Sequence, residues 1–398
     1  MTARPMSREI AIVAGARTPI GKFGGALRGS NAIEIGAHAI GAAVKRAGID
    51  PATVDEVVVG HARQAGNGPN PGRLMSIRAG MPVSAPVQTV QQACVSSMKA
   101  VILATQSILL GDAEIVVAAG AEHMSGIPFF VPDMRWGNRM GDANLIDGLS
   151  KDGFRDPLTG KHMGELADAW SARYGITRED QDAYSLRSQR TAQAAKESGF
   201  AGATIAALEF ERKGKKTVVT DDEHPRPDTT MESLSRLDPA FVKGGSVTAG
   251  NASGITDGAG AIVVMSAEAA ARTGAEPLAW IRAYAVAALA PEDYGLAVEP
   301  ASARALERAG VESDDLDVIE INEAFAIQVL AACKEMKIDP DRVNTAGGAI
   351  ALGHPVGMSG VRVVHYAVEA LHRGGGRWAL ATICGNGGQG AAVVIERA

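Results

Sequence analysis

The sequence has few of the residues on which several classes of protein depend. Three cysteines among 398 residues are too few for a disulfide framework, and their spacings match no zinc-binding pattern. With 39 basic against 45 acidic residues the net charge is −6, so the basic excess of a general nucleic-acid binder is missing. We therefore expect a protein of a reducing compartment with no nucleic-acid partner.

Long apolar runs and targeting signals are also scarce. The chain has no run of about 18 consecutive apolar residues, and its opening residues, MTARPMSREI, contain no apolar stretch of a secretory leader. The glycine-rich segment 246–266 has neither the G-x-G-x-x-G nor the G-x-x-x-x-G-K-[ST] spacing, which argues against a nucleotide cofactor. These absences predict a cytosolic, cytoplasmic protein with no membrane partner.

What the chain does have is the composition of a globular enzyme. Apolar residues make up 46% and charged residues 21%, while aromatic residues make up only 4%. The length exceeds what one hydrophobic core normally supports, so we expect two or three packed units. Forty-seven glycines, about 12% of the chain against an average of about 7%, predict many tight turns and close backbone approaches.

An internal repeat organises this length. The segment 43–59 aligns without gaps on 305–321, an offset of 262 residues. In both copies a helix pattern ends at a glycine, an acidic turn follows and an apolar strand begins. The order of elements continues with a helix after Cys94 and another after His354, each followed by an apolar strand. This alternation predicts two α/β halves with a mostly parallel sheet covered by helices on both faces.

Residues 125–245 interrupt the alternation with charges and turns. They contain one clear helix, whose start at Thr177 resembles a capping box and which should end at Gly199. We therefore assign 1–124 with about 246–272 to an N-terminal half, 125–245 to an inserted loop domain and 273–398 to a C-terminal half.

Cys94 and His354 occupy equivalent places in the two repeats. Each lies in a loop between a strand and a helix, and in open α/β sheets ligands bind where such loops leave the carboxyl ends of strands. The helix after Cys94 is expected to lower the pKa of its thiol and make it a nucleophile, and His354 is a base suited to a thiol. Taken alone each residue is more often structural, but the shared position in the repeat favours catalysis.

Three further residues are considered for chemistry. Cys384 ends an apolar strand and enters the loop CGNGGQG, whose backbone N–H groups suit an oxyanion site, although packing explains it equally well. Asn322 directly follows the strand DVIEI, where it is either a helix N-cap or a polar group at the catalytic edge. Cys333 lies inside an apolar helix pattern and is assigned to packing.

Motifs along the whole chain, taken together, resemble the thiolase family. The segments that carry the resemblance are ARTPIGKFGGALRG (16–29), Cys94 with SSMKA, RWGNRMGD (135–142), KHMGELAD (161–168), TAGNASGITDGAGA (248–261), INEAFA (321–326), GGAIALGHPVGMSG (347–360) and CGNGGQG (384–390). Their order and spacing are far more specific than any one of them. The resemblance implies a thiolase-like α/β fold of two duplicated halves with mixed sheets covered by helices, an inserted loop domain, and a homotetramer built as a dimer of dimers.

The resemblance also implies roles for individual residues. Cys94 would take the acyl group as a thioester after His354 removes its proton, and Cys384 would move the α-proton of a second acyl-CoA. Asn322 would hold a water that stabilises the thioester oxygen together with His354, and the backbone N–H of Asn386 would serve a second oxyanion site. The residues expected to contact coenzyme A and substrate are His162, Met163, Arg226, Phe241, Ala249, Gly250, Ser253 and Ala324. Coenzyme A thioesters are then substrates, and no metal or other cofactor is expected.

Three departures from the usual thiolase pattern bear on substrate choice. Val95 follows Cys94 where the family usually has Gly or Ala, and its bulk would narrow the site. Asn386 stands where a glycine is usual, and asparagine tolerates an unusual φ better than most residues. The run YGLAVEP (294–300) replaces the usual Met-Gly-x-Gly-Pro-x-Pro beside the acyl pocket.

The favoured activity is that of the short-chain type, which interconverts two acetyl-CoA with acetoacetyl-CoA and CoA. His162 before Met163 and the RWGNRMGD segment resemble the short-chain enzymes. The alternatives are a degradative 3-ketoacyl-CoA thiolase of longer chain length and a ketoacyl synthase, against which Cys384 and Asn322 argue. A thiolase-like protein that binds acyl-CoA without turning it over is the remaining alternative.

Overall fold

The computed structural model describes residues 6–212 and 214–398. The strands are β1 Ile10–Arg17, β2 Gly21–Lys22, β3 Glu56–Gly60, β4 Val87–Val90, β5 Ile115–His123, β6 Phe129–Phe130, β7 Ile146–Asp147, β8 Leu208–Arg212, β9 Lys215–Val219, β10 Thr256–Ser266, β11 Ala279–Ala288, β12 Val318–Ile321, β13 Trp378–Gly385 and β14 Gln389–Arg397. The helices are α1 Ala32–Ala47, α2 Pro71–Arg78, α3 Ser96–Leu110, α4 Met163–Tyr174, α5 Arg178–Glu197, α6 Phe200–Thr204, α7 Met231–Ser235, α8 Ala267–Thr273, α9 Val298–Ala309, α10 Ala326–Met336, α11 Ala349–Leu352 and α12 Ser359–Gly374.

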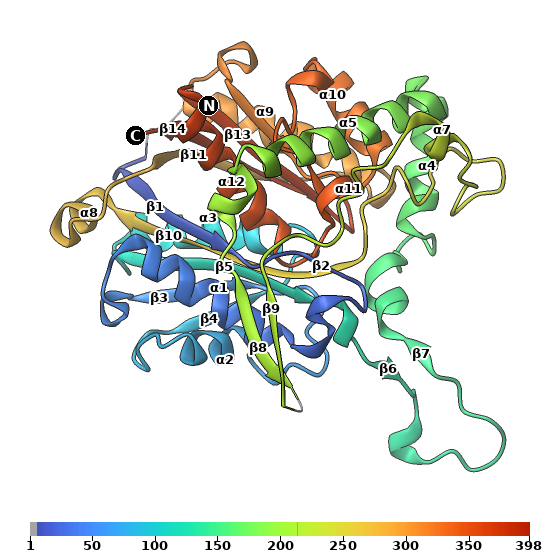
Figure 1. The fold of residues 1–398 in the computed structure, drawn as a ribbon, viewed down its shortest axis with the longest axis horizontal. Helices are drawn as coiled ribbons and strands as arrows, with labels where there is room; N and C mark the ends of the chain where they lie inside the picture. Colours follow the sequence, from blue (N-terminus) through green and yellow to red (C-terminus); the bar gives the residue numbers. More distant parts are fainter. Residues whose placement is uncertain (1–5, 213) are drawn as a thin grey trace.

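One mixed sheet connects the two halves in the part of the chain that is described (Figure 1). Its order is β12-β13-β14-β11-β1-β10-β5-β3-β4, with β2 paired to β10. The halves meet where β1 pairs with β11 through Ile10–Ile12. The mixed sheet agrees with the implied fold class, but the expected predominance of parallel pairs is wrong. Only β3–β4, β3–β5 and β12–β13 are parallel, because β14 turns straight back on β13 and β10 lies antiparallel between β1 and β5.

The structure confirms the internal repeat. The elements α1, β3, α3 and β5 correspond in order to α9, β12, α12 and β13, and the two strand pairs β3–β5 and β12–β13 are both parallel. Both α1 and α9 end at a glycine with left-handed backbone, Gly48 with φ 67° and Gly310 with φ 68°. A side chain at either position would be strained, which explains why the glycines end the helices.

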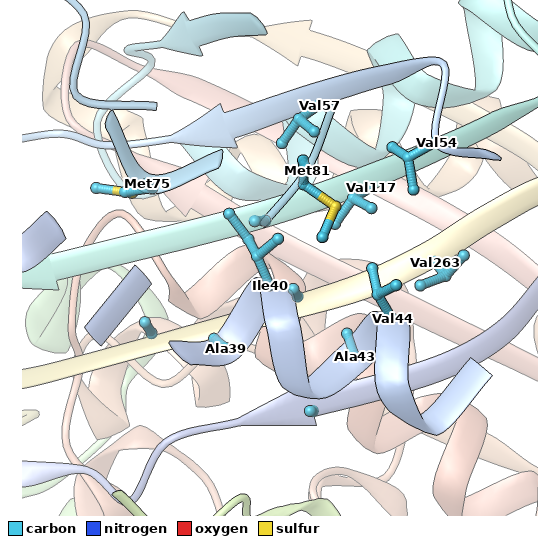
Figure 2. Packing of buried hydrophobic residues seen from close by; sticks show 14 of the residues in the cluster. Ala39, Ile40, Ala43, Val44, Val54, Val57, Met75, Met81, Val117 and Val263 are labelled. Atoms are coloured by element: carbon cyan, nitrogen blue, oxygen red, sulfur yellow. The ribbon is translucent and has the colours of Figure 1, made fainter. Parts of the chain in front are cut away.

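Helices cover the outer faces of the two halves and also fill the space between them. α1 packs on the outer face of the N-terminal half, where Ile40 and Val44 meet Val117 of β5 and Val263 of β10 (Figure 2). α9 packs against β11 and β14 of the C-terminal half. α3 and α12 contact each other and lie between the halves, sharing a core with strands of both. This central pair positions the two loops that precede it.

The segment Ala93–Leu110, which includes α3, is the one window among the described residues that is long and apolar enough to cross a membrane, with a mean hydropathy of 1.6. No run of this kind was expected from the sequence. Its packing accounts for its composition, because 56% of the window is buried inside the molecule. α3 contacts β3, β5 and α12.

The segment predicted as an inserted loop domain holds more regular structure than its sequence suggests. α5 begins with the predicted capping box at Thr177 and ends at Glu197, two residues before the predicted Gly199. α4, two short strands β6 and β7, and the hairpin β8–β9 were not predicted. The connection between β6 and β7 extends away from the body of the molecule (Figure 1). α4 and α10 pack together, so part of this segment forms one wall of the site described next.

Candidate active site

Cys94, His354 and Cys384 line one cavity of about 530 Å³. Cys94 lies two residues before α3 and His354 five residues before α12, while Cys384 lies at the end of β13. Because α3 and α12 pack side by side between the halves, the loops before them open into the same space. The three residues therefore come together as the repeat predicted.

The loop of Cys94 is a tight turn under backbone strain. Ala93 has a positive φ of 48°, which is unfavourable for a residue with a side chain. The Ser96 hydroxyl ties the turn together, since it accepts a hydrogen bond from the Gln92 N–H at 2.9 Å and donates to the Ala93 carbonyl at 2.6 Å. The turn thus fixes where the Cys94 thiol stands, and strain held at such a place is common at functional sites.

The expected lowering of the Cys94 pKa is wrong for the protein without substrate. Burial raises the pKa of the Cys94 thiol to about 11, although Arg63 and the backbone N–H of Asn386 both lower it. Loss of water disfavours the charged form more than the nearby helix favours it. The thiol is therefore neutral at physiological pH.

His354 is held as a neutral imidazole with one nitrogen free. Its Nδ1 lies 2.6 Å from the Ser359 hydroxyl, and that hydroxyl donates to the Pro355 carbonyl at 3.1 Å. Since the Ser359 proton is engaged there, Nδ1 is assigned as the N–H donor and Nε2 carries the lone pair. Nε2 is buried without a hydrogen-bond partner. Burial, with Arg362 and Arg63, lowers the pKa of His354 to about 3.

Cys384 and Asn386 line the cavity beside Cys94. Burial, reinforced by Cys94, raises the pKa of the Cys384 thiol well above its usual range, so this thiol is neutral as well. The φ of Asn386 is not positive, so this position does not need a residue that tolerates an unusual φ. Its backbone N–H forms a hydrogen bond to the Cys94 sulfur and lowers the pKa of that thiol. Gly387 and Gly388, with φ of 80° and 84°, make the turn that follows.

Asn322 lies behind the cavity rather than on its wall. The residue is fully buried, its Oδ1 accepts from Arg362 at 3.4 Å and its Nδ2 has no partner. It is no helix cap, because α10 begins at Ala326 with Phe325 before it. The neighbouring Glu323 has a packing role, as its carboxylate accepts from Tyr184 and Ser188. Burial raises the pKa of Glu320 to about 8 although Arg362 opposes the shift.

The residues predicted to contact coenzyme A lie on this cavity, with one exception. The wall includes His162, Met163, Arg226, Phe241, Ala249, Ser253 and Ala324. Gly250 instead lines a neighbouring cavity with Arg226 and Ala249, because its backbone turns toward Leu234 and Leu237 of the inserted segment. His162 stacks on Phe241 with ring centroids 4.7 Å apart. The stacked rings of His162 and Phe241 thus form an aromatic part of the cavity wall. Arg226 lines both cavities and lies where they adjoin.

Two of the three departures have structural explanations. Val95 does not narrow the site, because its side chain is fully buried in the core beneath the loop and does not line the cavity. Tyr294 does line the cavity, and its hydroxyl donates to the Met163 carbonyl at 3.1 Å. Tyr294 thereby fixes the start of α4 beside the two thiols.

Sequence reasoning missed a buried carboxylate that connects the loop after β3 with the loop of His354. Glu122 lies at the end of β5 and forms an ion pair with His61 at 3.1 Å. It also accepts hydrogen bonds from the backbone N–H groups of Ala62, Arg63 and Gly357 at 2.9 to 3.1 Å. Glu122 raises the pKa of His61 against the effect of burial, and His61 lowers that of Glu122 likewise. The repeat gave no signal for this pair, because β13 ends in Cys384 and Gly385 at the corresponding place.

Comparisons with known proteins agree with this geometry. Family models described as "Thiolase, N-terminal domain" and "Thiolase, C-terminal domain" match residues 10–268 and 275–397. An acetyl-CoA acetyltransferase of Cupriavidus necator is 46% identical over 98% of this chain and 99% of its own length. The crystal structure of the Bacillus anthracis acetyl-CoA acetyltransferase superposes with a TM-score of 0.96 at 41% identity, covering 98% of this chain and 99% of that one. Human mitochondrial 3-ketoacyl-CoA thiolase in complex with CoA gives 0.96 at 36% identity, covering all of both chains.

Proposed function

Because the chain belongs to the thiolase family, we propose that it is an acetyl-CoA C-acetyltransferase. It condenses two acetyl-CoA to acetoacetyl-CoA and CoA, reversibly and by a ping-pong reaction through an acyl-cysteine, as a step of lipid metabolism. The observation that carries the proposal is the meeting of Cys94, His354 and Cys384 on one cavity. The full-length likeness to proteins named acetyl-CoA acetyltransferase supports the choice of acetyl as the acyl group.

In the first half-reaction Cys94 takes the acetyl group. The free Nε2 of His354 accepts the thiol proton as the sulfur attacks the thioester carbonyl. The bond from the carbonyl carbon to the CoA sulfur breaks, and the departing CoA sulfur takes the proton of Cys384. The backbone N–H of Asn386 stabilises the negative charge that develops on the thioester oxygen. A water bound to Asn322 stabilises it as well, together with His354.

In the second half-reaction Cys384 acts as the base. Its thiolate removes a methyl proton from a second acetyl-CoA, and the resulting enolate attacks the acetyl group on Cys94. The Cys94 sulfur leaves and recovers its proton from His354, so every group returns to its starting state. Burial makes the Cys384 thiolate a stronger base than a thiolate in water. These side chains account for each proton, and we propose that no metal or other cofactor takes part.

Comparing thiolysis of acetoacetyl-CoA with thiolysis of a long-chain 3-ketoacyl-CoA tests the acyl-length assignment. We expect the higher kcat/KM for acetoacetyl-CoA. A clear preference for the longer substrate would establish the degradative alternative instead. Intact mass after incubation with acetyl-CoA tests turnover as such: an acetyl adduct on Cys94 is expected, and its absence together with no turnover would indicate a binding protein.

Our proposals for the assembly and the location rest on the family likeness alone. We propose a cytoplasmic homotetramer arranged as a dimer of dimers. Light scattering of the purified protein tests the assembly, and a monomeric mass would overturn it.

A further inference from the structure

Arg63 is a buried cation on the cavity wall that the proposed reaction does not use. The residue follows β3, its side chain is only 7% exposed, and it lines the cavity beside Cys94. Its Nε has no hydrogen-bond partner in the described part of the chain. Among residues 6–212 and 214–398 no carboxylate forms an ion pair with its guanidinium. A buried guanidinium without a partner is costly, so a partner from outside the chain is expected at this place.

One buried carboxylate, Glu122, has its pKa lowered in part by the Arg63 charge, but its oxygens are bonded elsewhere. Glu122 bonds to the backbone N–H of Arg63, to two other N–H groups and to His61, and it forms no bond with the guanidinium. On the other side the guanidinium lies against Gly153, where a Cβ atom would come within 2.8 Å of its Nε. Glu122 thus anchors the main chain of Arg63, and the guanidinium lies between Gly153 and the cavity that it lines.

The cavity continues in two directions, and Arg63 marks one of them. On the side of His224, Arg226 and Ala249 it adjoins the cavity that contains Gly250. On the other side it shares Arg63 and Asn386 with a further cavity of about 1130 Å³. Arg226 and Ala249, which the family resemblance predicts to contact coenzyme A, lie on the first side. The Arg63 side, next to the Cys94 sulfur, is then left for the acyl group.

From this arrangement we propose that Arg63 binds the terminal carboxylate of a dicarboxylic acyl group. The site then accepts short acyl-CoA thioesters with an acidic end, and the matching 3-oxo thioesters in the thiolysis direction, in addition to acetyl-CoA. The planar guanidinium fork matches a carboxylate with two parallel hydrogen bonds, and this pairing is strongest in a dry site. The inference rests on the proposed thiolase reaction, because it concerns the acyl group that Cys94 carries.

If the charge of Arg63 served only to adjust the pKa values of the catalytic residues, replacing Arg63 would give a different result. Arg63 lowers the pKa of both Cys94 and His354, so its loss alone would slow the reaction of the thiol with every substrate. Recognition of a carboxylate affects only substrates that carry one. The ratio of two substrates, measured in the same variant, separates the roles because any general loss of activity cancels.

The experiment compares thiolysis of two 3-oxo thioesters of CoA with six-carbon chains, one ending in a carboxylate and the other in a methyl group. In the natural protein kcat/KM is expected to be at least about tenfold higher for the acidic substrate. In Arg63→Met the ratio falls at least tenfold, and Arg63→Lys keeps part of it. Lys216→Met, which removes a charge from the exposed hairpin β8–β9 and lines neither cavity, leaves the ratio unchanged.

Two outcomes would overturn the inference: a natural protein that prefers the methyl-ended substrate, or an Arg63→Met variant that loses activity equally on both. If Arg63→Met does not fold, the ratio in the natural protein and in Arg63→Lys decides. Acetoacetyl-CoA serves as the reference substrate. No thiolysis of it by the natural protein means that the proposed function fails, whereas thiolysis of it without the acidic preference means that only the Arg63 inference fails.

Discussion

The loops before α3 and α12 occupy the same place in the two halves and present different chemistry. The first presents the Cys94 thiol from a strained turn held by Ser96, and the second presents the His354 imidazole oriented by Ser359. Both loops open into one cavity because the helices that follow them are packed together between the halves. The difference teaches that duplication sets where the functional groups stand, while single residues set what each does.

Burial shifts the pKa values of Cys94 and His354 in opposite directions, and both shifts favour the neutral form of the group. It raises the pKa of Cys94 to about 11 and lowers that of His354 to about 3. The resting pair is therefore a neutral thiol and a neutral imidazole rather than an ion pair. A proton then moves between them only when the attack on a thioester relocates the charge, so the nucleophile forms with the substrate in place.

The largest expected effects on activity concern the two thiols in the cavity, Cys94 from the N-terminal half and Cys384 from the C-terminal half. Cys94→Ala should lower condensation by roughly 10⁴-fold or more and abolish the acetyl adduct seen by intact mass. Cys384→Ala should stop condensation while the adduct still forms, although more slowly, because a CoA thiolate can leave without the Cys384 proton whereas the methyl proton of the second acetyl-CoA then has no base. Cys333→Ala, in the packed helix α10, is the matched control and should stay within a few-fold of the natural rate. Full condensation activity in both active-site variants would refute the two-thiol reaction.

Removing the base or its support tests the other loop. His354→Gln should reduce kcat by about 10²- to 10⁴-fold, and Ser359→Ala by about 10- to 100-fold, because the imidazole loses the bond that fixes its tautomer. For Ser359→Ala the fall should lie in kcat with KM nearly unchanged, and Ser359→Thr should recover much of the loss. An equal loss in Ser359→Thr, or a change confined to KM, would show that Ser359 only packs.

The buried Glu122 carboxylate connects the loop after β3 in the N-terminal half with the His354 loop in the C-terminal half. Glu122→Gln should lower the free energy of unfolding by about 3 to 5 kcal/mol, since it leaves His61 without its buried partner. Glu209→Gln breaks an exposed ion pair with Lys216 at 2.6 Å and should cost less than about 1 kcal/mol. Urea unfolding of both variants measures the contrast. Equal losses would mean that Glu122 does not hold the halves in register.

The last prediction concerns acid stability, which we assign to the C-terminal half. Burial lowers the pKa of both His354 and His365 to about 3, so the folded protein binds their protons less tightly than the unfolded chain. Above about pH 6.5 the two histidines are neutral in both states and cost no stability. As the pH falls from about 6.5 toward 3, each lowers the free energy of unfolding by about 1.4 kcal/mol per pH unit, because only the unfolded chain binds the proton. His365→Gln should remove one of the two slopes in urea unfolding at pH 4 to 6. An unchanged pH slope would contradict the buried neutral state of His365.

The sequence predicted the parts of the site that depend on local pattern. The gapless repeat located the two helix-preceding loops, and the motifs around Cys94, His354 and Cys384 identified the residues that the structure brings to one cavity. The capping box at Thr177 began α5 as expected. Each of these signals lies within a few residues of the feature that it predicts.

Features that depend on contacts between distant segments were wrong or missing. The sheet is mixed because β10 inserts between β1 and β5, a pairing that alternation of strands and helices does not specify. The thiol pKa rises because the folded chain excludes water, although the helix pattern alone predicted a decrease. Val95 points into the core and Gly250 faces another cavity, although their neighbours in sequence line the site.

The sequence by itself determined that this protein consists of two related α/β halves and that their equivalent loops carry a thiol and an imidazole. Local propensity and side-chain identity suffice for that much. Only the tertiary structure decided the protonation of these groups, the link that Glu122 makes between the loop after β3 and the His354 loop, and the exposure of Arg63 to the cavity. These properties arise from burial and from the approach of segments far apart in the chain, and no local pattern records either.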